Sequence, residues 1–239
     1  MALVDSGDYT AAYLLLNETD NENSKKLQES IKIQYERVLM SEAETGSFVI
    51  FGTYEQDDNT ADGKENIEWI VLTKEDKRIL LISRYALDCQ MYNKSDESES
   101  ITWEDCSVRE WLNETFMNTA FSEDERALIP ELTVNADNNP SFDVSPGNST
   151  TDRVFLLSIL EVQKYFGSDN ARVCLGTAYC NAHRDKHETD NCSWWLRSPG
   201  NYSSTVAYIN DGGSIINGGI RANYRYNAIR PALWINLES

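Results

Sequence analysis

Three cysteines and two histidines gather in one short stretch, and their side chains are the ones best suited to chemistry. The stretch spans 19 residues and contains Cys174, Cys180, His183, His187 and Cys192. Thiolate and imidazole groups are common ligands of tetrahedral zinc. However, the stretch has no Cys-x2-Cys pair, and Cys-x5-Cys-x2-His is not a standard zinc spacing. We therefore expect free thiols in a loop and no metal or cofactor. The alternatives are a structural metal or a redox pair, either Cys174–Cys180 or Cys174–Cys192.

Other arrangements that enzymes use are not found in the sequence. Two histidines are too few to support an acid–base mechanism, and no serine or cysteine lies in a nucleophile-elbow pattern. Asp57, Asp58, Asp62 and Glu65 could hold calcium, but they do not match the register of an EF-hand loop. We expect a solvated acidic loop there. The sequence thus favours a protein that is not an enzyme.

The segment 201–227 has the residue types of a recognition surface. Tyrosine, asparagine, glycine and serine fill 16 of its 27 positions, as in antibody paratopes. Tyrosine offers a large amphipathic face with few torsions to fix, and arginine adds a planar donor that is common at interface hot spots. The expected ligand-binding residues are Asn201, Tyr202, Ser203, Tyr208, Asn210, Asn217, Arg221, Asn223, Tyr224, Arg225, Tyr226 and Asn227. The alternative is a set of plain turns in an antiparallel sheet, because Asn-Asp-Gly-Gly at 210–213 is a good hairpin turn by itself.

Two tryptophan-rich motifs flank this segment, and they favour a structural role. Trp194, Trp195 and Trp234 are expected in the core together with Leu196, and not as stacking platforms for a ligand. Arg197 and Arg230 are expected to be buried or half-buried and paired with backbone carbonyls or with an acid. Such pairing would fix the strands on either side of the segment.

The net charge excludes several partners. The chain has a formal charge of −18, which argues against nucleic acid and anionic membranes. Residues 190–239 carry three acidic and four basic residues, a net of +1, so residues 1–189 carry −19. No apolar run is long enough to span a bilayer, and the first residues do not resemble a secretory signal. We expect a cytoplasmic protein, or part of a longer one, with reduced thiols.

Periodicity divides the chain into a short helical segment, 1–44, and a domain, 45–239. Helices are expected at about 8–16 and 24–40, where the pattern resembles the end of a helical-repeat array; an ordinary helical cap is the alternative. β-branched and aromatic runs at 47–54, 67–73 and 78–85 predict an antiparallel meander.

Helix starts and short strands follow in the second half of the chain. Capping boxes are expected at Ser107–Glu110, Ser122–Glu125 and Ser158–Glu161. Residues 131–152 are expected to form a loop and 167–192 to be irregular. Short strands with glycine-rich turns follow from Ser193 onward. The predicted class is α+β, with antiparallel strands and a few helices packed on one side.

An ordered set of motifs carries a family resemblance over about residues 45–237. The most specific are Trp194-Trp-Leu-Arg-Ser-Pro-Gly200 and Arg230-Pro-Ala-Leu-Trp-Ile-Asn236, preceded by Arg109-Glu-Trp-Leu-Asn113 and Val154-Phe-Leu-Leu-Ser158. The set resembles an uncharacterised bacterial domain family. Its C-terminal half looks like the C-type-lectin-like fold shared with formylglycine-generating enzymes. Those enzymes hold copper on two cysteines near the chain end, but no cysteine follows Trp194 here, so the resemblance does not carry their catalysis over.

The chain also resembles a subset of lectin-like domains, the variable proteins of diversity-generating retroelements. In that group a C-terminal cassette is diversified at adenines, with asparagine codons as preferred targets. The resemblance places the cassette where Asn201, Asn210, Asn217, Asn223 and Asn227 lie. The predicted function is therefore a module that recognises a protein or glycan through segment 201–227. It would bind no nucleic acid, would not insert into a membrane, and could follow upstream helical-repeat or other modules. A metal-dependent enzyme on the same fold and a structural or assembly domain are the alternatives.

Overall fold

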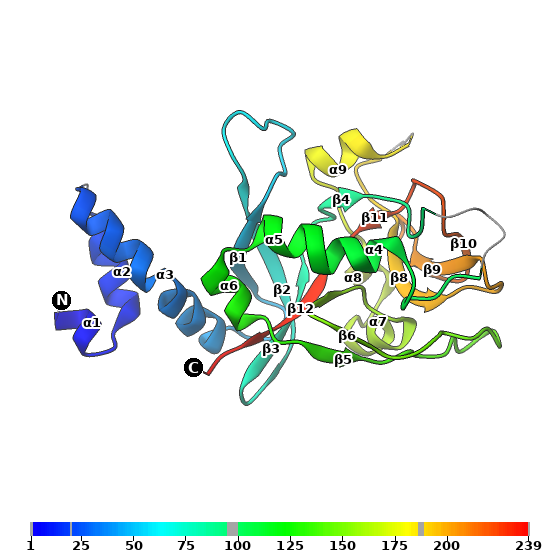
Figure 1. Ribbon diagram of the computed structural model, residues 1–239, viewed down its shortest axis with the longest axis horizontal. Helices are drawn as coiled ribbons and strands as arrows, with labels where there is room; N and C mark the ends of the chain where they lie inside the picture. Colours follow the sequence, from blue (N-terminus) through cyan, green and yellow to red (C-terminus); the bar gives the residue numbers. More distant parts are fainter. Residues whose placement is uncertain (1, 20, 95–99, 186–188, 239) are drawn as a thin grey trace.

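Two five-stranded sheets form the centre of the protein, with helices packed around them (Figure 1). The computed structural model describes residues 2–19, 21–94, 100–185 and 189–238. Helices and strands are mixed and most strand pairs are antiparallel, which confirms the α+β class. None of the helices in these four ranges combines the length and the apolar character that crossing a membrane requires.

The first sheet joins the start of the domain to the end of the chain. Its order is β1-β2-β3-β12-β7, and all its pairs are antiparallel. The strands are β1 (Phe48–Tyr54), β2 (Glu65–Glu75), β3 (Arg78–Ser83), β12 (Ala232–Asn236) and β7 (Val154–Phe155). The meander β1-β2-β3 agrees with the sequence. β12 then pairs with β3, with Leu233 opposite Leu81, so the C-terminal motif completes the sheet.

The second sheet contains most of the C-terminal segment. Its order is β10-β9-β8-β11-β4, antiparallel except for the parallel contact of β11 with β8. The strands are β10 (Ile215–Arg221), β9 (Thr205–Ile209), β8 (Trp194–Pro199), β11 (Ala228–Ile229) and β4 (Asp88–Cys89). Strand β4 lies at one edge, so residues that precede the helical region of the domain stand beside residues from the end of the chain.

Buried tryptophans hold the two sheets in one core. Trp69, Trp194 and Trp195 are fully buried, and each indole N–H donates to a backbone carbonyl 2.7–3.1 Å away. This confirms the core role expected for the first motif, including Leu196. Trp234 is different, because it is only half-buried and lies under the Arg78 guanidinium at 4.3 Å.

The helices of the domain are short. They are α4 (Ser107–Trp111), η1 (Leu112–Phe116), α5 (Met117–Ala120), α6 (Glu123–Leu128), α7 (Ile159–Tyr165), α8 (Asp169–Arg172) and α9 (Ala178–His183). The first three form one continuous rod in which η1 is a π-helical turn. The boxes at Ser122 and Ser158 are present as expected. The box at Ser107 is wrong: Cys106 occupies the cap position, and the Ser107 hydroxyl accepts from the Lys94 N–H at 3.1 Å instead.

Two regions have more regular structure than the sequence indicated. Region 167–192 contains α8 and α9, each begun by a hydroxyl cap, from Ser168 and Thr177 respectively. The loop at 131–152 contains a small two-stranded sheet, β5 (Leu132–Val134) with β6 (Thr150–Asp152). The cause of both errors is the length of these elements, which is too short for hydrophobic periodicity to register.

The N-terminal helices extend from one end of the domain (Figure 1). They are α1 (Ala2–Asp5), α2 (Tyr9–Asn17) and α3 (Glu22–Glu42). Helices α2 and α3 pack together through stacked Tyr13 and Tyr35 rings, 4.2 Å apart. The last turns of α3 join the domain: Met40 lies in the common core, and Arg37 donates to the Leu237 carbonyl at 2.8 Å. The change from helix to strand falls between α3 and β1.

Candidate functional site

The C-terminal segment 201–227 is divided between the ends of the second sheet and its loops. Asn201, Tyr202 and Ser203 lie in the turn between β8 and β9, and Tyr208 lies in β9. Asn210 lies in the β9–β10 turn, Asn217 and Arg221 lie in β10, and Asn223, Tyr224, Arg225, Tyr226 and Asn227 form the connection from β10 to β11. The predicted residues therefore do not form one continuous loop.

Three of the four tyrosines face the solvent. Tyr202, Tyr224 and Tyr226 are exposed by 67%, 48% and 43%, respectively. Burial of aromatic rings is favourable, so three large exposed rings in one segment are unusual for a purely structural turn region. Tyr208 is half-buried and packs edge-on against Trp195, with 6.5 Å between ring centroids. Its ring belongs partly to the framework.

Two of the predicted asparagines stabilise turns. The Asn210 side-chain oxygen accepts from the Ser214 N–H at 2.8 Å, and the Asn201 oxygen accepts from the Thr205 hydroxyl at 3.2 Å. The turn at Gly213 also needs its glycine: φ is +84°, and a Cβ there would lie 1.9 Å from the Asp169 carbonyl oxygen. The plain-turn alternative therefore describes these positions well.

Asn217 connects the segment to the loop that precedes β6. Its side-chain amide donates to the Ser141 hydroxyl at 2.9 Å. Its backbone carbonyl accepts from the Asn139 side-chain amide at 2.8 Å. Asn139 is buried and also donates to the Pro199 carbonyl at 2.7 Å. The loop thus borders the recognition segment, which composition alone did not indicate.

Asn227 corrects the expectation of a surface contact. Its side chain is fully buried, and neither of its polar atoms has a hydrogen-bond partner among the described residues. Its backbone carbonyl, by contrast, accepts a hydrogen bond from the Cys89 thiol at 3.5 Å. The chain turns inward here to enter β11, so Asn227 cannot contact a partner at the surface.

A pocket of about 640 Å³ opens beside the β10–β11 connection. We call it the Asp88 pocket. Its lining comes from five separate parts of the chain: Tyr54 from β1; Asp88, Cys89, Gln90, Met91 and Lys94 from β4 and the residues after it; Trp111, Thr115 and Thr119 from the helical rod; Tyr179 and His183 from α9; and Arg225. Of the predicted ligand-binding residues, only Arg225 lines it. Thr115 comes from the π-helical turn, a feature that is frequent at functional sites.

Asp88 is the deeply buried charge of this pocket, with 6% of its surface exposed. It accepts from the Tyr54 hydroxyl at 2.6 Å and from the Cys89 N–H at 2.6 Å. Burial, and then the adjacent Asp88 carboxylate, raise the pKa of Tyr54 well above its ordinary value. The phenol therefore remains a hydrogen-bond donor at physiological pH.

The pocket contains no activated thiol. Burial and the neighbouring Asp88 raise the pKa of Cys89 to about 12, so this residue is a neutral thiol at pH 7. A thiol in that state is a poor nucleophile and a poor metal ligand. The arrangement is suited to holding a ligand by hydrogen bonds, charge and aromatic contact.

All five cysteines are buried. Cys174 and Cys192 lie in loops as expected, whereas Cys180 lies in α9. All five are free. The Cys180 thiol donates to the Asp88 backbone carbonyl at 3.2 Å. Its interaction with Cys192 raises the pKa of Cys180 and lowers the pKa of Cys192. Among the described residues, these thiols and His183 do not gather three ligand atoms in one place. His187, the remaining member of the Cys/His cluster considered as an alternative metal site, lies outside the described residues.

Three carboxylates come together in the acidic loop. They are not the set Asp57, Asp58, Asp62 and Glu65 that the sequence suggested. Glu55, Asp57 and Glu65 have ligand atoms within 4.8 Å of one another. One Glu65 oxygen accepts from the Gln56 N–H at 2.6 Å and from the Asp57 N–H at 3.3 Å. These bonds close the β1–β2 hairpin, so the structure of the hairpin explains why the carboxylates lie together.

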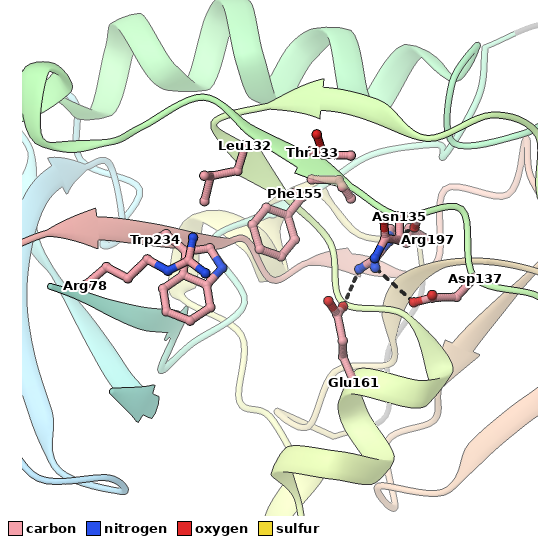
Figure 2. A pocket seen from close by; sticks show the side chains of 10 residues that line it. Arg78, Leu132, Thr133, Asn135, Asp137, Phe155, Glu161, Arg197 and Trp234 are labelled. Carbon is pink, nitrogen blue, oxygen red and sulfur yellow. Dashed lines mark hydrogen bonds and ion pairs between the residues drawn. The ribbon is translucent and has the colours of Figure 1, made fainter. Parts of the chain in front are cut away.

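A second pocket, of about 180 Å³, surrounds Arg197 (Figure 2). We call it the Arg197 pocket. The arginine is 5% exposed and donates to the carboxylates of Glu161 and Asp137, the latter at 3.1 Å. It also donates to the Leu156 carbonyl at 2.9 Å. This confirms a buried arginine paired with an acid and with backbone. Arg230 is likewise buried and donates to the Ser83 carbonyl at 2.9 Å.

The comparisons with known proteins give one family and no function. No curated protein and no solved structure matches the chain. One family model, described as a domain of unknown function (DUF6273), matches residues 76–237. The match includes both sheets except β1 and β2, and it contains both pockets except Tyr54. Since the match covers more than half of the chain, the protein belongs to the DUF6273 family.

Proposed function

We propose that this protein is a recognition module that binds a protein or a glycan through the exposed residues of segment 201–227. The observation that carries the proposal is the exposure of Tyr202, Tyr224 and Tyr226 on a framework whose other aromatic residues, apart from Phe48 and Phe142, are buried or half-buried. Arg221 and Arg225 are exposed in the same segment. Rigid aromatic anchors with adaptable polar neighbours are the composition of surfaces that bind macromolecules.

The structural role of the flanking strands supports this proposal. β8 is buried along its whole length, and β11 and most of β12 are also buried. A substitution in the exposed loops would therefore leave the core unchanged. Loops that a rigid scaffold positions are where binding residues concentrate.

The resemblance to C-type-lectin-like domains and to retroelement-diversified proteins extends the proposal. On that reading, the exposed positions of segment 201–227 vary between copies while the buried strands stay constant. A reverse transcriptase gene beside a near-copy of the 3′ end of the gene, differing from it only at adenines, would support diversification. Without such a pair of sequences, the module would be a binding domain of fixed specificity.

The test is a binding screen with a matched surface control. The wild-type protein is applied to a glycan array and to a displayed peptide library, and each selected ligand is then titrated. The combined variant Tyr202→Ser, Tyr224→Ser and Tyr226→Ser should weaken binding by at least about a hundredfold, because several aromatic anchors are lost. Phe48→Ser, which removes a 54% exposed ring from β1, should bind like wild type.

Two results for the triple variant would contradict the proposal. If the triple variant binds the selected ligands as wild type does, the tyrosines are not anchors. If it unfolds while Phe48→Ser does not, they belong to the framework. The alternative of a metal-dependent enzyme is tested by elemental analysis of the purified protein, where stoichiometric zinc, copper or iron would favour it.

A further inference from the structure

The charge of Asp88 lacks a cationic partner among the described residues. Its donors are the Tyr54 hydroxyl, the Cys89 N–H and, at a long 3.5 Å, the Gln90 amide, all of them neutral. A carboxylate that is 94% buried ordinarily has a cation or a metal beside it, because its loss of hydration is costly. Within the part of the chain that the structure describes, Asp88 is not in a group of potential metal ligands. A partner from outside the chain would supply the missing charge.

The carboxylate also has room for another donor. Its two oxygens offer about four acceptor positions. The described contacts use three, and the Gln90 contact is weak at its length. Asp88 lines the pocket, so the remaining position is accessible to a ligand inside it. The volume of about 640 Å³ falls within the range of small-molecule sites.

The aromatic walls favour a positively charged group. Tyr54, Trp111 and Tyr179 line the same pocket, and the Tyr54 and Tyr179 rings meet edge to face at 5.9 Å. The face of an aromatic ring attracts cations, and tryptophan does so most strongly. Together with a buried carboxylate, these rings can replace the hydration shell of an ammonium group.

Further carboxylates lie near the aromatic walls. Burial raises the pKa of Tyr179, and the charges of Asp88, Asp58 and Glu55 raise it further. These three carboxylates therefore contribute negative potential at the Tyr179 side of the pocket. The charge of −19 on residues 1–189 extends the same field and accelerates the approach of cations.

Two positively charged side chains also line the pocket. Lys94 and Arg225 are exposed and line the pocket, so they can meet a carboxylate or carbonyl oxygen. A simple amine would leave them without a contact, and a simple anion would meet the buried charge of Asp88. A molecule that carries both an ammonium group and an acceptor oxygen matches both features.

We propose that the Asp88 pocket binds the ammonium group of an amino-acid-type ligand, with an acceptor oxygen of the same ligand directed toward Arg225 and Lys94. This inference rests on the proposed function, because Arg225 belongs to the recognition segment. The pocket then supplies the polar subsite of that surface, and the exposed tyrosines contact the rest of the partner. The ligand is either a free amino acid or a lysine side chain in a polypeptide.

A matched set of small probes tests the proposal on the wild-type chain by calorimetry. The set is 6-aminohexanoate, hexylamine, hexanoate and 1-hexanol, which share a carbon chain and differ in charge. We expect 6-aminohexanoate to bind most tightly, hexylamine more weakly, and the other two without saturation. If hexanoate binds as well as 6-aminohexanoate does, the pocket is an anion site and the proposal is wrong. Absence of binding by both amines overturns it as well.

Two substitutions assign the binding to the pocket. Asp88→Asn keeps the shape and should weaken 6-aminohexanoate by at least about tenfold, the effect of losing a charged hydrogen bond. Asp143→Asn makes the same change of net charge at an exposed position and should stay within about twofold. Equal affinities of the two variants contradict the proposal. If Asp88→Asn does not fold, Trp111→Leu provides the second variant, because it removes an aromatic wall.

Two further probes distinguish the sources of the ammonium group. L-Lysine represents a free amino acid, and Nα-acetyl-lysine N-methylamide represents a residue within a polypeptide. Asp88-dependent binding of the second probe supports a peptide partner, and binding of the first alone supports a free amino acid. Failure of all the amine probes, with tyrosine-dependent binding intact, overturns the pocket assignment only. Loss of tyrosine dependence with the probes still bound overturns the proposed function instead.

Discussion

The two pockets each contain a buried charge, but they treat it differently. Arg197 is surrounded by two carboxylates and by backbone carbonyls, so its charge is neutralised within the fold (Figure 2). Asp88 meets only neutral donors in the described chain. A charge that the fold neutralises stabilises the arrangement of its own elements. A charge that it leaves without a counter-ion lowers stability and becomes available to a ligand.

The largest expected effect on stability is in the Arg197 pocket, where the fold neutralises the buried charge. Arg197→Met removes the donor to Glu161, Asp137 and the Leu156 carbonyl. It should lower the free energy of unfolding by about 3 kcal/mol or more, because the acids and the carbonyl lose their partner in a buried site. Urea unfolding measures this change. A loss below about 1 kcal/mol would contradict a structural role for Arg197.

A third buried charge, in helix α3, sharpens the comparison through pH. Burial, and then the nearby Glu125 carboxylate, raise the pKa of Glu36 to about 7. Lys32, which pairs with both acids, only partly offsets these effects. The folded state then binds a proton more tightly than the unfolded state does, so Glu36 lowers the free energy of unfolding as pH rises from about 4.5 through 7.

Glu36→Gln should remove that dependence. The variant should match wild type near pH 4 and exceed its stability by about 2 kcal/mol at pH 8. Thermal unfolding of both proteins across this range measures the difference. Identical pH profiles would show that Glu36 is ionised at little cost in the folded protein.

Tyr208→Ala tests where the framework ends and the recognition surface begins. Tyr208 is half-buried against Trp195, so its loss should cost about 1–2 kcal/mol of stability. Tyr224→Ala should cost less than about 0.5 kcal/mol, because that ring is 48% exposed. Denaturant midpoints of the two variants provide the comparison. Equal losses would mean that both rings belong to the core.

Asp88→Asn should have the smallest effect on the ligand-free protein. The Tyr54 hydroxyl can reverse and accept from the new amide, while the asparagine oxygen still accepts from the Cys89 N–H. Removal of an uncompensated charge offsets what is lost, so the free energy of unfolding should change by less than about 1 kcal/mol. A loss as large as that of Arg197→Met would remove the distinction between the pockets.

Local signals in the sequence predicted the α+β class and several of its elements. The boxes at Ser122 and Ser158 depend on residues three positions apart, and the strands of the meander depend on their own composition. The box at Ser107 failed because a backbone N–H from Lys94, outside the helix, competes for the same hydroxyl. Sequence pattern does not reveal such a competitor.

The site could be predicted only in part, for a related reason. Composition located the exposed tyrosines, but it could not show that the chain turns inward at Asn227. The Asp88 pocket brings together residues that are more than 100 positions apart, such as Tyr54 and Tyr179. Its one local signal is an acidic residue, Asp88, in the mostly apolar run 86–92. A buried carboxylate in such a run indicates a site only once its partners are known.

The most direct test of the account is an amide chemical-shift map of the isotope-labelled protein titrated with 6-aminohexanoate. Amide shifts should move at Cys89, Gln90 and residues 224–226, because these residues line or border the Asp88 pocket. Shifts of Asn135, Phe155 and other residues around Arg197 should stay in place. Movement around Arg197 with none around Asp88 would contradict the account.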